Sequence, residues 1–375
     1  METLFWICVA FVLYTYAGYP AAVVLWGTYF PRRVDKRYGS IPVSVVVAAR
    51  DEEINIRARL ENLRAQEYPS ELVEIIVVSD GSTDRTAQVV RELGDDGVVL
   101  VETPGPVGKA EALNLGVARA TNDVIVFADA RQRFEPNVIA ELVAMLADEK
   151  VGAVSGELVI ERGVGSEVGE GVGLYWDYEK LIRRMESNVY ATVGATGSIY
   201  AIRKRLYVPL EAHALLDDFL IPMRIVLQGY RVLFVRSARA HDLASATVSQ
   251  EFARKVRTLA GNFQALTLEP RLLNPAANPL FIQFVSHKLC RLLVPYAFAL
   301  ALLASALSGG WFYAAAFWLQ VAVFAAGFLN HTRLREGFAG RLLRLSWTFT
   351  VLNTAAVMGL WVYATGRERT VWKRA

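Results

Sequence analysis

Short apolar runs alternate with segments of helical periodicity between residues 40 and 240 of this chain. The intervening segments repeat apolar residues at helical spacing, as in 52–66 and 109–120, and a late helix is predicted over 217–229. Near-continuous apolar runs of strand length lie at 42–50, 73–80, 97–103, 123–130 and 151–162. This alternation predicts an α/β fold with a mostly parallel sheet that is covered on both faces.

Three longer stretches without charged residues lie outside this region, at 3–31, 292–330 and 345–366, and a Ser-Gly-Gly sequence at 308–310 breaks the second. Because about 20 apolar residues cross a bilayer, we expect membrane spans near 4–27, 290–308, 311–329 and 346–365. A cleaved signal peptide is the alternative for the first span, but no Lys or Arg precedes it and the stretch is too long.

Basic residues beside these stretches predict how the chain is oriented, because positive loops stay in the cytoplasm. One group follows the first span directly (Arg32, Arg33, Lys36 and Arg37), and a second precedes the last span (Arg333, Arg335, Arg341 and Arg344). Both groups place the central region in the cytoplasm and the N-terminus outside. The C-terminal tail conflicts with this orientation, since a fourth span would place its basic residues outside the cytoplasm (Arg367, Arg369, Lys373 and Arg374). We favour a span for this rather polar last stretch, with packing on other helices or a place in the interface as the alternative.

These patterns divide the chain into four parts. An N-terminal transmembrane helix (1–31) precedes a cytoplasmic domain (32–270), an interface helix region (271–291) and C-terminal transmembrane helices with a basic tail (292–375). Within the third part, residues 278–291 are apolar on one side and end in His287, Lys288 and Arg291. A helix there would lie in the membrane interface and bring the cleft of the cytoplasmic domain close to the bilayer. We therefore expect a multi-pass protein of the plasma membrane.

Composition excludes several other classes of protein. The 375 residues are 54% hydrophobic and carry a net charge of only +3, so nucleic acid is not an expected partner. Cys8 and Cys290 are far apart in apolar segments, and the four histidines are scattered. A disulfide framework and a zinc site are therefore not expected. The oligomeric state cannot be predicted from these features.

Polar residues stand at the end of the second predicted strand, in the sequence "VVSDGSTD" over residues 77–84. In open α/β sheets, ligands bind outside the carboxyl ends of the strands. Asp80 could accept hydrogen bonds from a base or ribose there, while Gly81 lets the backbone approach and the following helix offers free amides. The alternative is that Ser82, Thr83 or Asp84 merely caps that helix.

Polar sequences stand in a fixed order at the ends of the other predicted elements as well. They are "AARDEE" (48–53), "SDGSTD" (79–84), "GPVGKAEALNLG" (105–116), "FADARQRFEP" (127–136), "ATGSIYAIRK" (195–204) and "LLDDFLIPMRIVLQGYRV" (215–232). Together, over about residues 40–260, this series resembles the family 2 glycosyltransferases with the GT-A fold, a Rossmann-like nucleotide-sugar-binding domain. The most similar branch is the membrane-embedded one that includes cellulose and hyaluronan synthases and related exopolysaccharide transferases.

The resemblance implies a nucleotide-sugar donor, usually linked to UDP, and inversion at the anomeric carbon. Glu52 and Asp80 match positions that hold the uridine in such enzymes, and Lys109 matches a lysine near the nucleotide. Asp129 matches the first acid of the DxD motif that holds Mg²⁺ or Mn²⁺ against the diphosphate. Asp218 matches the general base of the TED motif, here written "LDD".

The residues alone leave simpler roles open for these side chains. Asp129 could cap a turn, and Lys109 could be a solvated lysine in the first turn of its helix. Of the two neighbouring acids Asp217 and Asp218, either could cap the late helix while the other faces the cleft. We favour Asp218 as the base because its spacing to Arg224 fits the motif.

Two departures from the family pattern bear on cofactor and product. Arg131 replaces the second acid of DxD and cannot ligate a cation, so either Asp129 and the diphosphate hold the metal or Arg131 itself faces phosphate. The QxxRW motif of processive synthases appears as "EFARK" over 251–255. Arg254 remains to meet the diphosphate, but Lys255 replaces the tryptophan that stacks on the acceptor sugar. The loss favours single additions or short chains over a long polymer.

We therefore expect an inverting glycosyltransferase that moves a sugar from a nucleotide-sugar to a lipid-linked or polysaccharide acceptor at the cytoplasmic membrane face. Its role would be in cell-envelope or extracellular polysaccharide synthesis. The alternative, suggested by Arg131 and Lys255, is an inactive transferase that serves as a membrane scaffold or donor sensor.

Overall fold

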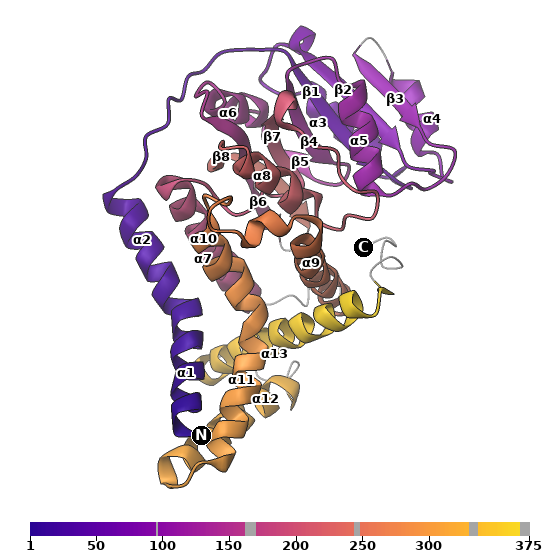
Figure 1. Cartoon of the computed structure of the whole chain (residues 1–375). Coiled ribbons are helices and arrows are strands. Elements are labelled where there is room, and N and C mark those ends of the chain that lie inside the picture. The colour runs from indigo at the N-terminus through magenta and orange to yellow at the C-terminus, as the bar shows by residue number, and fades with distance from the viewer. Residues whose placement is uncertain (95–96, 162–169, 244–247, 330–336, 368–375) are drawn as a thin grey trace.

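The computed structural model describes residues 1–94, 97–161, 170–243, 248–329 and 337–367. An α/β domain occupies one end of the molecule, and apolar helices from both ends of the chain extend from it (Figure 1). The basic residues Arg333, Arg335, Arg369, Lys373 and Arg374, on which the predicted orientation partly rests, lie outside the described residues.

One sheet forms the centre of the α/β domain, in the order β3-β2-β1-β4-β7-β6-β8-β5. Its strands are β1 (Val43–Ala49), β2 (Val73–Ser79), β3 (Val98–Glu102), β4 (Val124–Asp129), β5 (Arg133–Phe134), β6 (Val151–Glu161), β7 (Ile199–Arg203) and β8 (Arg231–Leu243). β3, β2, β1 and β4 are parallel neighbours, as the alternation predicts. β7 runs antiparallel between β4 and β6, while β6 and β8 pair in parallel with two irregularities in register. The expected mostly parallel α/β fold is confirmed, with β7 as an antiparallel strand in its middle.

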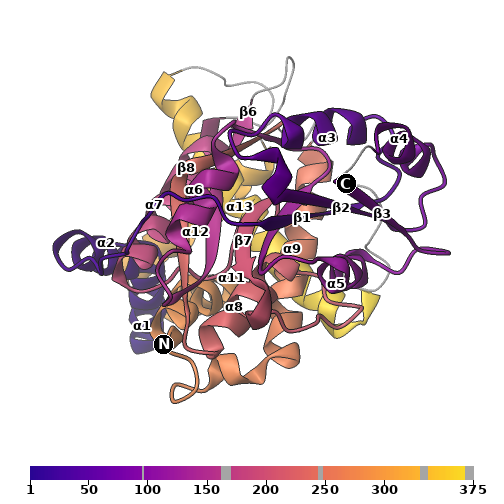
Figure 2. The same cartoon turned by 90° about the horizontal axis from the view of Figure 1, so that it is seen from above.

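Helices cover both faces of the sheet (Figure 2). α3 (Ile56–Arg64), α4 (Thr86–Leu93) and α6 (Val138–Met145) share one apolar core with alternate residues of β1, such as Val45. α5 (Lys109–Arg119) and α8 (Asp217–Leu227) share the other core with the intervening residues, such as Val46. Because successive side chains of a strand point to opposite faces, burial on both sides explains why these strands are apolar throughout.

Two helices in the described part of the chain are long and apolar enough to cross a membrane. The first, Glu2–Tyr29, consists of α1 (Glu2–Leu13) and α2 (Tyr19–Tyr29), which a short π-helix (Tyr14–Gly18) connects. The second, Phe281–Leu307, consists of α10 (Phe281–Phe284) and α11 (Cys290–Leu307), which a second π-helix (Val285–Leu289) connects. They correspond to the spans expected near 4–27 and 290–308. α12 (Trp311–Leu329) contains a shorter apolar helix at the place of the third expected span.

The last helix, α13 (Gly337–Ala364), lies across α1 and α11 in Figure 1 and does not run beside them. It packs on α9 (Val248–Leu268), where the rings of Phe263 and Tyr363 stack with centroids 6.4 Å apart. Gly359 allows this approach, since a Cβ atom there would lie 2.9 Å from the backbone nitrogen of Ala260. The stretch expected near 346–365 therefore packs against a helix of the α/β domain.

The apolar helices pack closely against the α/β domain, as the following two contacts illustrate. Gly27 of α2 lies against α7 (Glu170–Val189) so closely that an added Cβ would be 2.7 Å from the carbonyl oxygen of Met185. The ring of Phe284, in the expected interface region 271–291, lies 6.1 Å from that of Phe219 in α8. The segment that leads into α11 therefore packs against the first turn of α8.

Candidate active site

Lys109 brings together the ends of three elements that are far apart in the sequence. It is the first residue of α5 and follows Gly108, whose φ of +96° suits glycine. Its Nζ lies 3.1 Å from Oδ1 of Asp129, at the end of β4, and 3.4 Å from Oδ1 of Asp217, at the start of α8. The site thus lies at the carboxyl edge of the parallel strands, where α/β proteins bind ligands.

Lys109 and the acidic residues around it shift one another's pKa values. Burial lowers the pKa of the Lys109 amine, but Asp129, Asp217 and Asp218 together raise it by more and so keep the amine positively charged. Burial raises the pKa of Asp217 to about 6, against the lowering effect of Lys109. Lys109 thus pairs with Asp129 and Asp217, and Oδ2 of Asp217 remains buried without a hydrogen-bond partner among the described residues.

Asp218 is the second residue of α8, and its carboxyl group faces a different side from that of Asp217. A Cβ atom added to Gly197 would lie 3.0 Å from Oδ2 of Asp218, so glycine leaves room for this carboxyl group. The backbone of Asp218 accepts a hydrogen bond of 2.7 Å from the N–H of Ala195. Burial raises the pKa of Asp218, while the charges of Lys109, Lys288 and Arg183 lower it. A carboxylate with a raised pKa is suited to accept a proton near neutral pH.

Asp80 fixes the loop that leads to Lys109. Its carboxylate is almost fully buried and accepts hydrogen bonds from the backbone N–H groups of Val107 (2.6 Å) and Gly108 (3.1 Å). Gly81 follows with a φ of +56°, and a Cβ there would lie 2.5 Å from the carbonyl carbon of Gly105. The polar tip of β2 therefore shapes the turn before α5, and the contact of Asp80 with a nucleotide stays a prediction.

Glu52 lies in the neighbouring loop, after β1. Its carboxylate accepts a 2.7 Å hydrogen bond from the side-chain amide of Asn55, and its backbone N–H donates to Oγ1 of Thr86 (2.7 Å). Asp51 accepts from the N–H of Thr83 (2.8 Å) in the same way. These hydrogen bonds connect the loop after β1 to the loop after β2. The contact of Glu52 with uridine stays a prediction.

Arg131 and Arg254 point to partners outside the Lys109 group. Arg131 pairs with Asp242 at the end of β8, at 2.8 Å. Arg254 stands on α9 and pairs with Glu251 at 2.5 Å, and the neighbouring Lys255 Nζ lies 5.2 Å from the centre of the Trp176 ring on α7. Their predicted contacts with phosphate stay predictions.

A divalent cation fits this site only together with a substrate. Within the described residues, no group of three or more His, Cys, Asp or Glu side chains is placed to hold a metal. Asp129 supplies one carboxylate that is one-third exposed, and Mg²⁺ is commonly held by one or two carboxylates together with substrate phosphates. The donor set therefore suits Mg²⁺ or Mn²⁺ that arrives with a diphosphate, with Asp129 as the protein ligand.

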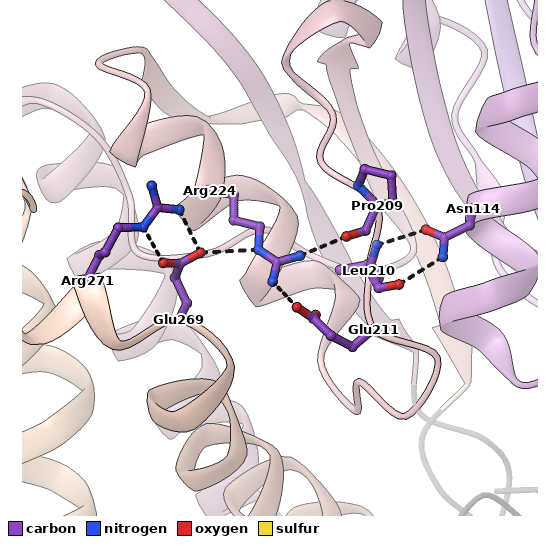
Figure 3. A network of polar contacts seen from close by, with 7 residues as sticks. All are labelled: Asn114, Pro209, Leu210, Glu211, Arg224, Glu269 and Arg271. Carbon is purple, nitrogen blue, oxygen red and sulfur yellow. Dashed lines mark hydrogen bonds and ion pairs between the residues drawn. The ribbon is translucent and has the colours of Figure 1, made fainter.

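A buried network holds α5 and α8 in place (Figure 3). Arg224 of α8 contacts Glu211 at 2.6 Å and Glu269 at 3.4 Å, and it donates to the carbonyl of Pro209 at 3.0 Å. Asn114 of α5 binds the backbone N–H and carbonyl of Leu210, each at 2.9 Å. The segment 209–211 thus links the helix that carries Lys109 to the helix that carries both aspartates.

The structure therefore brings together three of the predicted site residues, Lys109, Asp129 and Asp218, around α8. Sequence reasoning missed the contact of Asp217 with Lys109, and it missed Arg59, which is buried beneath the loop after β4 and donates to the carbonyl of Gln132 at 2.9 Å. In the sequence, Arg59 could have been noticed only because it is a charged residue on the apolar side of its helix.

Comparison with known proteins places these features in context. Residues 44–208 match the model of Glycosyl transferase family 2. The chain is 29% identical over 230 residues to the probable glycosyltransferase YdaM of Bacillus subtilis, covering 59% of this chain and 55% of that protein. It is 25% identical over 232 residues to the poly-beta-1,6-N-acetyl-D-glucosamine synthase of Staphylococcus aureus, covering 60% and 55%. The chain thus spans about half the length of these relatives.

A solved structure agrees over almost the whole chain. The mannosyltransferase PcManGT from Pyrobaculum calidifontis, in complex with GDP-Man and Mn²⁺, superposes with a TM-score of 0.75 at 23% identity, covering 97% of this chain and 99% of that one. This likeness establishes the fold, which is the expected GT-A fold with its flanking helices.

Proposed function

Since residues 44–208 match the model of Glycosyl transferase family 2, we propose that this chain is a glycosyltransferase that moves a sugar from a nucleotide-sugar to a lipid-linked or polysaccharide acceptor, with inversion. The reaction takes place at the cytoplasmic face of the plasma membrane and serves the synthesis of cell-envelope or extracellular polysaccharide. The observation that carries the proposal is the group of Lys109, Asp129, Asp217 and Asp218 at the carboxyl edge of the sheet.

Each side chain of this group has a task in the transfer. The acceptor hydroxyl oxygen forms a bond to the anomeric carbon of the donor sugar, and the bond from that carbon to the diphosphate oxygen breaks. The nucleoside diphosphate leaves with the electron pair, and Lys109 stabilises its charge. The hydroxyl proton passes to Asp218, and a positioned base of this kind contributes roughly 10²–10⁴-fold.

Asp217 has a positioning task in this scheme. Its carboxylate pairs with Lys109 and stands in the same helical turn as Asp218. The pair keeps the ammonium group directed at the place where the diphosphate would lie. A bound Mg²⁺ or Mn²⁺ would supply further neutralisation of the leaving diphosphate next to Asp129.

The nature of the donor and the place of reaction draw on the relatives. PcManGT was solved with GDP-Man and Mn²⁺, which supports a nucleotide-sugar and a divalent cation here. UDP is our first choice of nucleotide, and GDP is the second. The two long apolar helices and the similarity to poly-beta-1,6-N-acetyl-D-glucosamine synthase support a multi-pass membrane protein.

A panel of radiolabelled UDP- and GDP-sugars, incubated with membranes that contain the full chain, tests this proposal. We expect labelled lipid-linked or polymeric product from one donor and none from membranes that lack the chain. Calorimetry with UDP or GDP and Mn²⁺ separates an enzyme from an inactive scaffold, which would bind no nucleotide in a metal-dependent manner. Absence of both product and nucleotide binding across the panel would refute the proposal.

A further inference from the structure

The ammonium group of Lys109 pairs with the same carboxylates that would attract a metal ion to this site. Its Nζ lies 3.1 Å from Oδ1 of Asp129 and 3.4 Å from Oδ1 of Asp217. The side chain of Asp129 is 34% exposed and that of Asp217 only 10%, so Asp129 is the acid that a cation from solution can reach. Lys109 and a divalent cation therefore compete for the Asp129 carboxylate.

The loop after Asp129 offers positive charge and not a second acid. Arg131 stands two residues after Asp129 and pairs with Asp242 at 2.8 Å, so the carboxylate of Asp242 already has a cationic partner. Arg59 is almost fully buried beneath the same loop, where it donates to the carbonyl of Gln132 at 2.9 Å. A metal ion that approaches this loop therefore depends on Asp129, whose charge Lys109 already balances.

The backbone keeps Lys109 close to Asp129. Gly108 precedes it with a φ of +96°, and Asp80 accepts hydrogen bonds from the N–H groups of Val107 and Gly108, which fixes the start of α5. An ammonium group and a divalent cation at one carboxylate repel each other strongly, because they would stand only a few ångströms apart. A metal ion without a substrate must therefore overcome this repulsion and break the ion pair.

A diphosphate reverses this balance, because it brings negative charge next to both cations. Divalent cations such as Mg²⁺ are commonly held by one or two carboxylates together with substrate phosphates. The flexible side chain of Lys109 can contact a phosphate oxygen in place of Asp129, while Asp217 stays beside it. Binding of the metal ion and binding of the diphosphate are thus linked through one side chain.

We propose that Lys109 makes metal binding conditional on a diphosphate. It holds Asp129 as an internal counter-ion and gives up this carboxylate to a divalent cation only when a nucleoside diphosphate takes over the ammonium group. The inference rests on the proposed function, since it takes the donor to be a nucleoside diphosphate sugar. Lys109 thereby selects the complex of metal and diphosphate over the metal ion alone, and no covalent bond changes in this exchange.

Binding of Mn²⁺ alone to the full chain in a non-ionic detergent tests this role without turnover. Unbound Mn²⁺ is followed by its electron paramagnetic resonance signal during a titration. We expect Lys109→Met to bind Mn²⁺ at least about tenfold more tightly than the wild type does, because no ammonium group then competes for Asp129 and Asp217. Adding Asp129→Asn to Lys109→Met should remove this gain.

Two further variants separate the charge of Lys109 from other effects of the substitution. Lys109→Arg keeps the positive charge and should bind Mn²⁺ as weakly as the wild type. Arg119→Met is the matched control, because Arg119 is exposed on the same helix and its loss changes the net charge equally; it should leave the affinity for Mn²⁺ unchanged. Lys109→Gln also removes the charge and keeps the test decisive if Lys109→Met fails to fold.

Three outcomes would overturn the proposal. They are wild-type affinity for Mn²⁺ in the variants that lack the Lys109 charge, an equal gain in Arg119→Met, and a gain that persists when Asp129→Asn is added. Calorimetry with UDP or GDP on the wild type reports separately on the proposed function, which fails if no nucleotide binds, whatever Mn²⁺ alone does.

Discussion

Replacing Arg224 with methionine tests whether the network of Figure 3 holds the two catalytic helices together. The Arg224 guanidinium is buried between Glu211 at 2.6 Å and Glu269 at 3.4 Å, and it also binds the carbonyl of Pro209. Methionine fills a similar volume but leaves both carboxylates without this partner. We expect a less stable domain in which Lys109 and the aspartates of α8 are less well placed.

The structure sets the size of the effect. Removing one partner of a buried ion pair costs about 3–5 kcal/mol. Glu269 keeps two hydrogen bonds from Arg271, of 2.6 and 2.9 Å, whereas Oε2 of Glu211 is buried without a hydrogen-bond partner among the described residues, so Glu211 depends on Arg224. The middle of the range, about 4 kcal/mol, is therefore expected. In a domain of this size each kcal/mol lowers Tm by about 2–4 °C, which gives a fall of about 8–16 °C.

Thermal unfolding followed by tryptophan fluorescence measures this fall. Arg271→Gln is the control, because the Arg271 side chain is 61% exposed and bound to the same Glu269. An exposed pair is worth about 0–1 kcal/mol, so its Tm should change by less than about 4 °C. If Arg224→Met lowered Tm by no more than Arg271→Gln does, the network would not be what holds α8, and the reasoning would be refuted.

Three further predictions concern the site itself. Lys109→Met should weaken the binding of UDP or GDP about 10–100-fold in calorimetry, as expected for the loss of a hydrogen bond from a charged group. Arg119 is exposed on the same helix, so Arg119→Met should leave nucleotide binding unchanged. Gly81→Ala should lower Tm by several degrees, because the φ of Gly81 is +56° and the new Cβ would lie 2.5 Å from Gly105. Gly105→Ala is the control and should leave Tm unchanged, because nothing lies within 4 Å of its Cβ position. Equal effects of the two substitutions on Tm would contradict the strain argument. Burial raises the pKa of Asp217 from 3.8 to about 6, so the folded chain keeps the proton of this carboxyl group to a higher pH than the unfolded chain. The contribution of this proton to the free energy of unfolding is therefore fully present below about pH 4 and is lost as the pH rises through 6. Tm of the wild type relative to Asp217→Asn should therefore decline from pH 4 to 6.5, and a rise would show that the shift has the opposite sign.

The parallel half of the sheet was predictable because each of its strands is buried on both faces. β1, β2 and β4 are apolar almost throughout, and glycine or acidic residues end them sharply. β7 was not recognised, because its five residues lie within the stretch 195–204, which was interpreted only as a family motif. Its antiparallel direction depends on pairing with β4 and β6, which local periodicity does not report.

The candidate site was predictable where a residue stands at the end of an element. Asp129 ends β4 and Lys109 begins α5, so the topology alone brings them to one edge. The pairing of Arg131 with Asp242 could not be predicted, because the two residues are far apart in the sequence and meet only in the folded sheet. The pairing of Arg254 with Glu251 is local, since the two residues stand at i and i+3 on α9, and the helical pattern could have indicated it.

Transfer by Asp218→Asn, measured beside nucleotide binding by the same protein, tests the central claim most directly. The account predicts that labelled product falls by at least about 100-fold, the usual share of a positioned base, while the affinity for the nucleotide with Mn²⁺ stays within about twofold. Exchanging Asp218 for asparagine keeps its volume beside Gly197, so packing should be preserved. Transfer at the wild-type rate would contradict the assignment of the base and, with it, the view that α8 delivers the proton acceptor to a bound nucleotide-sugar.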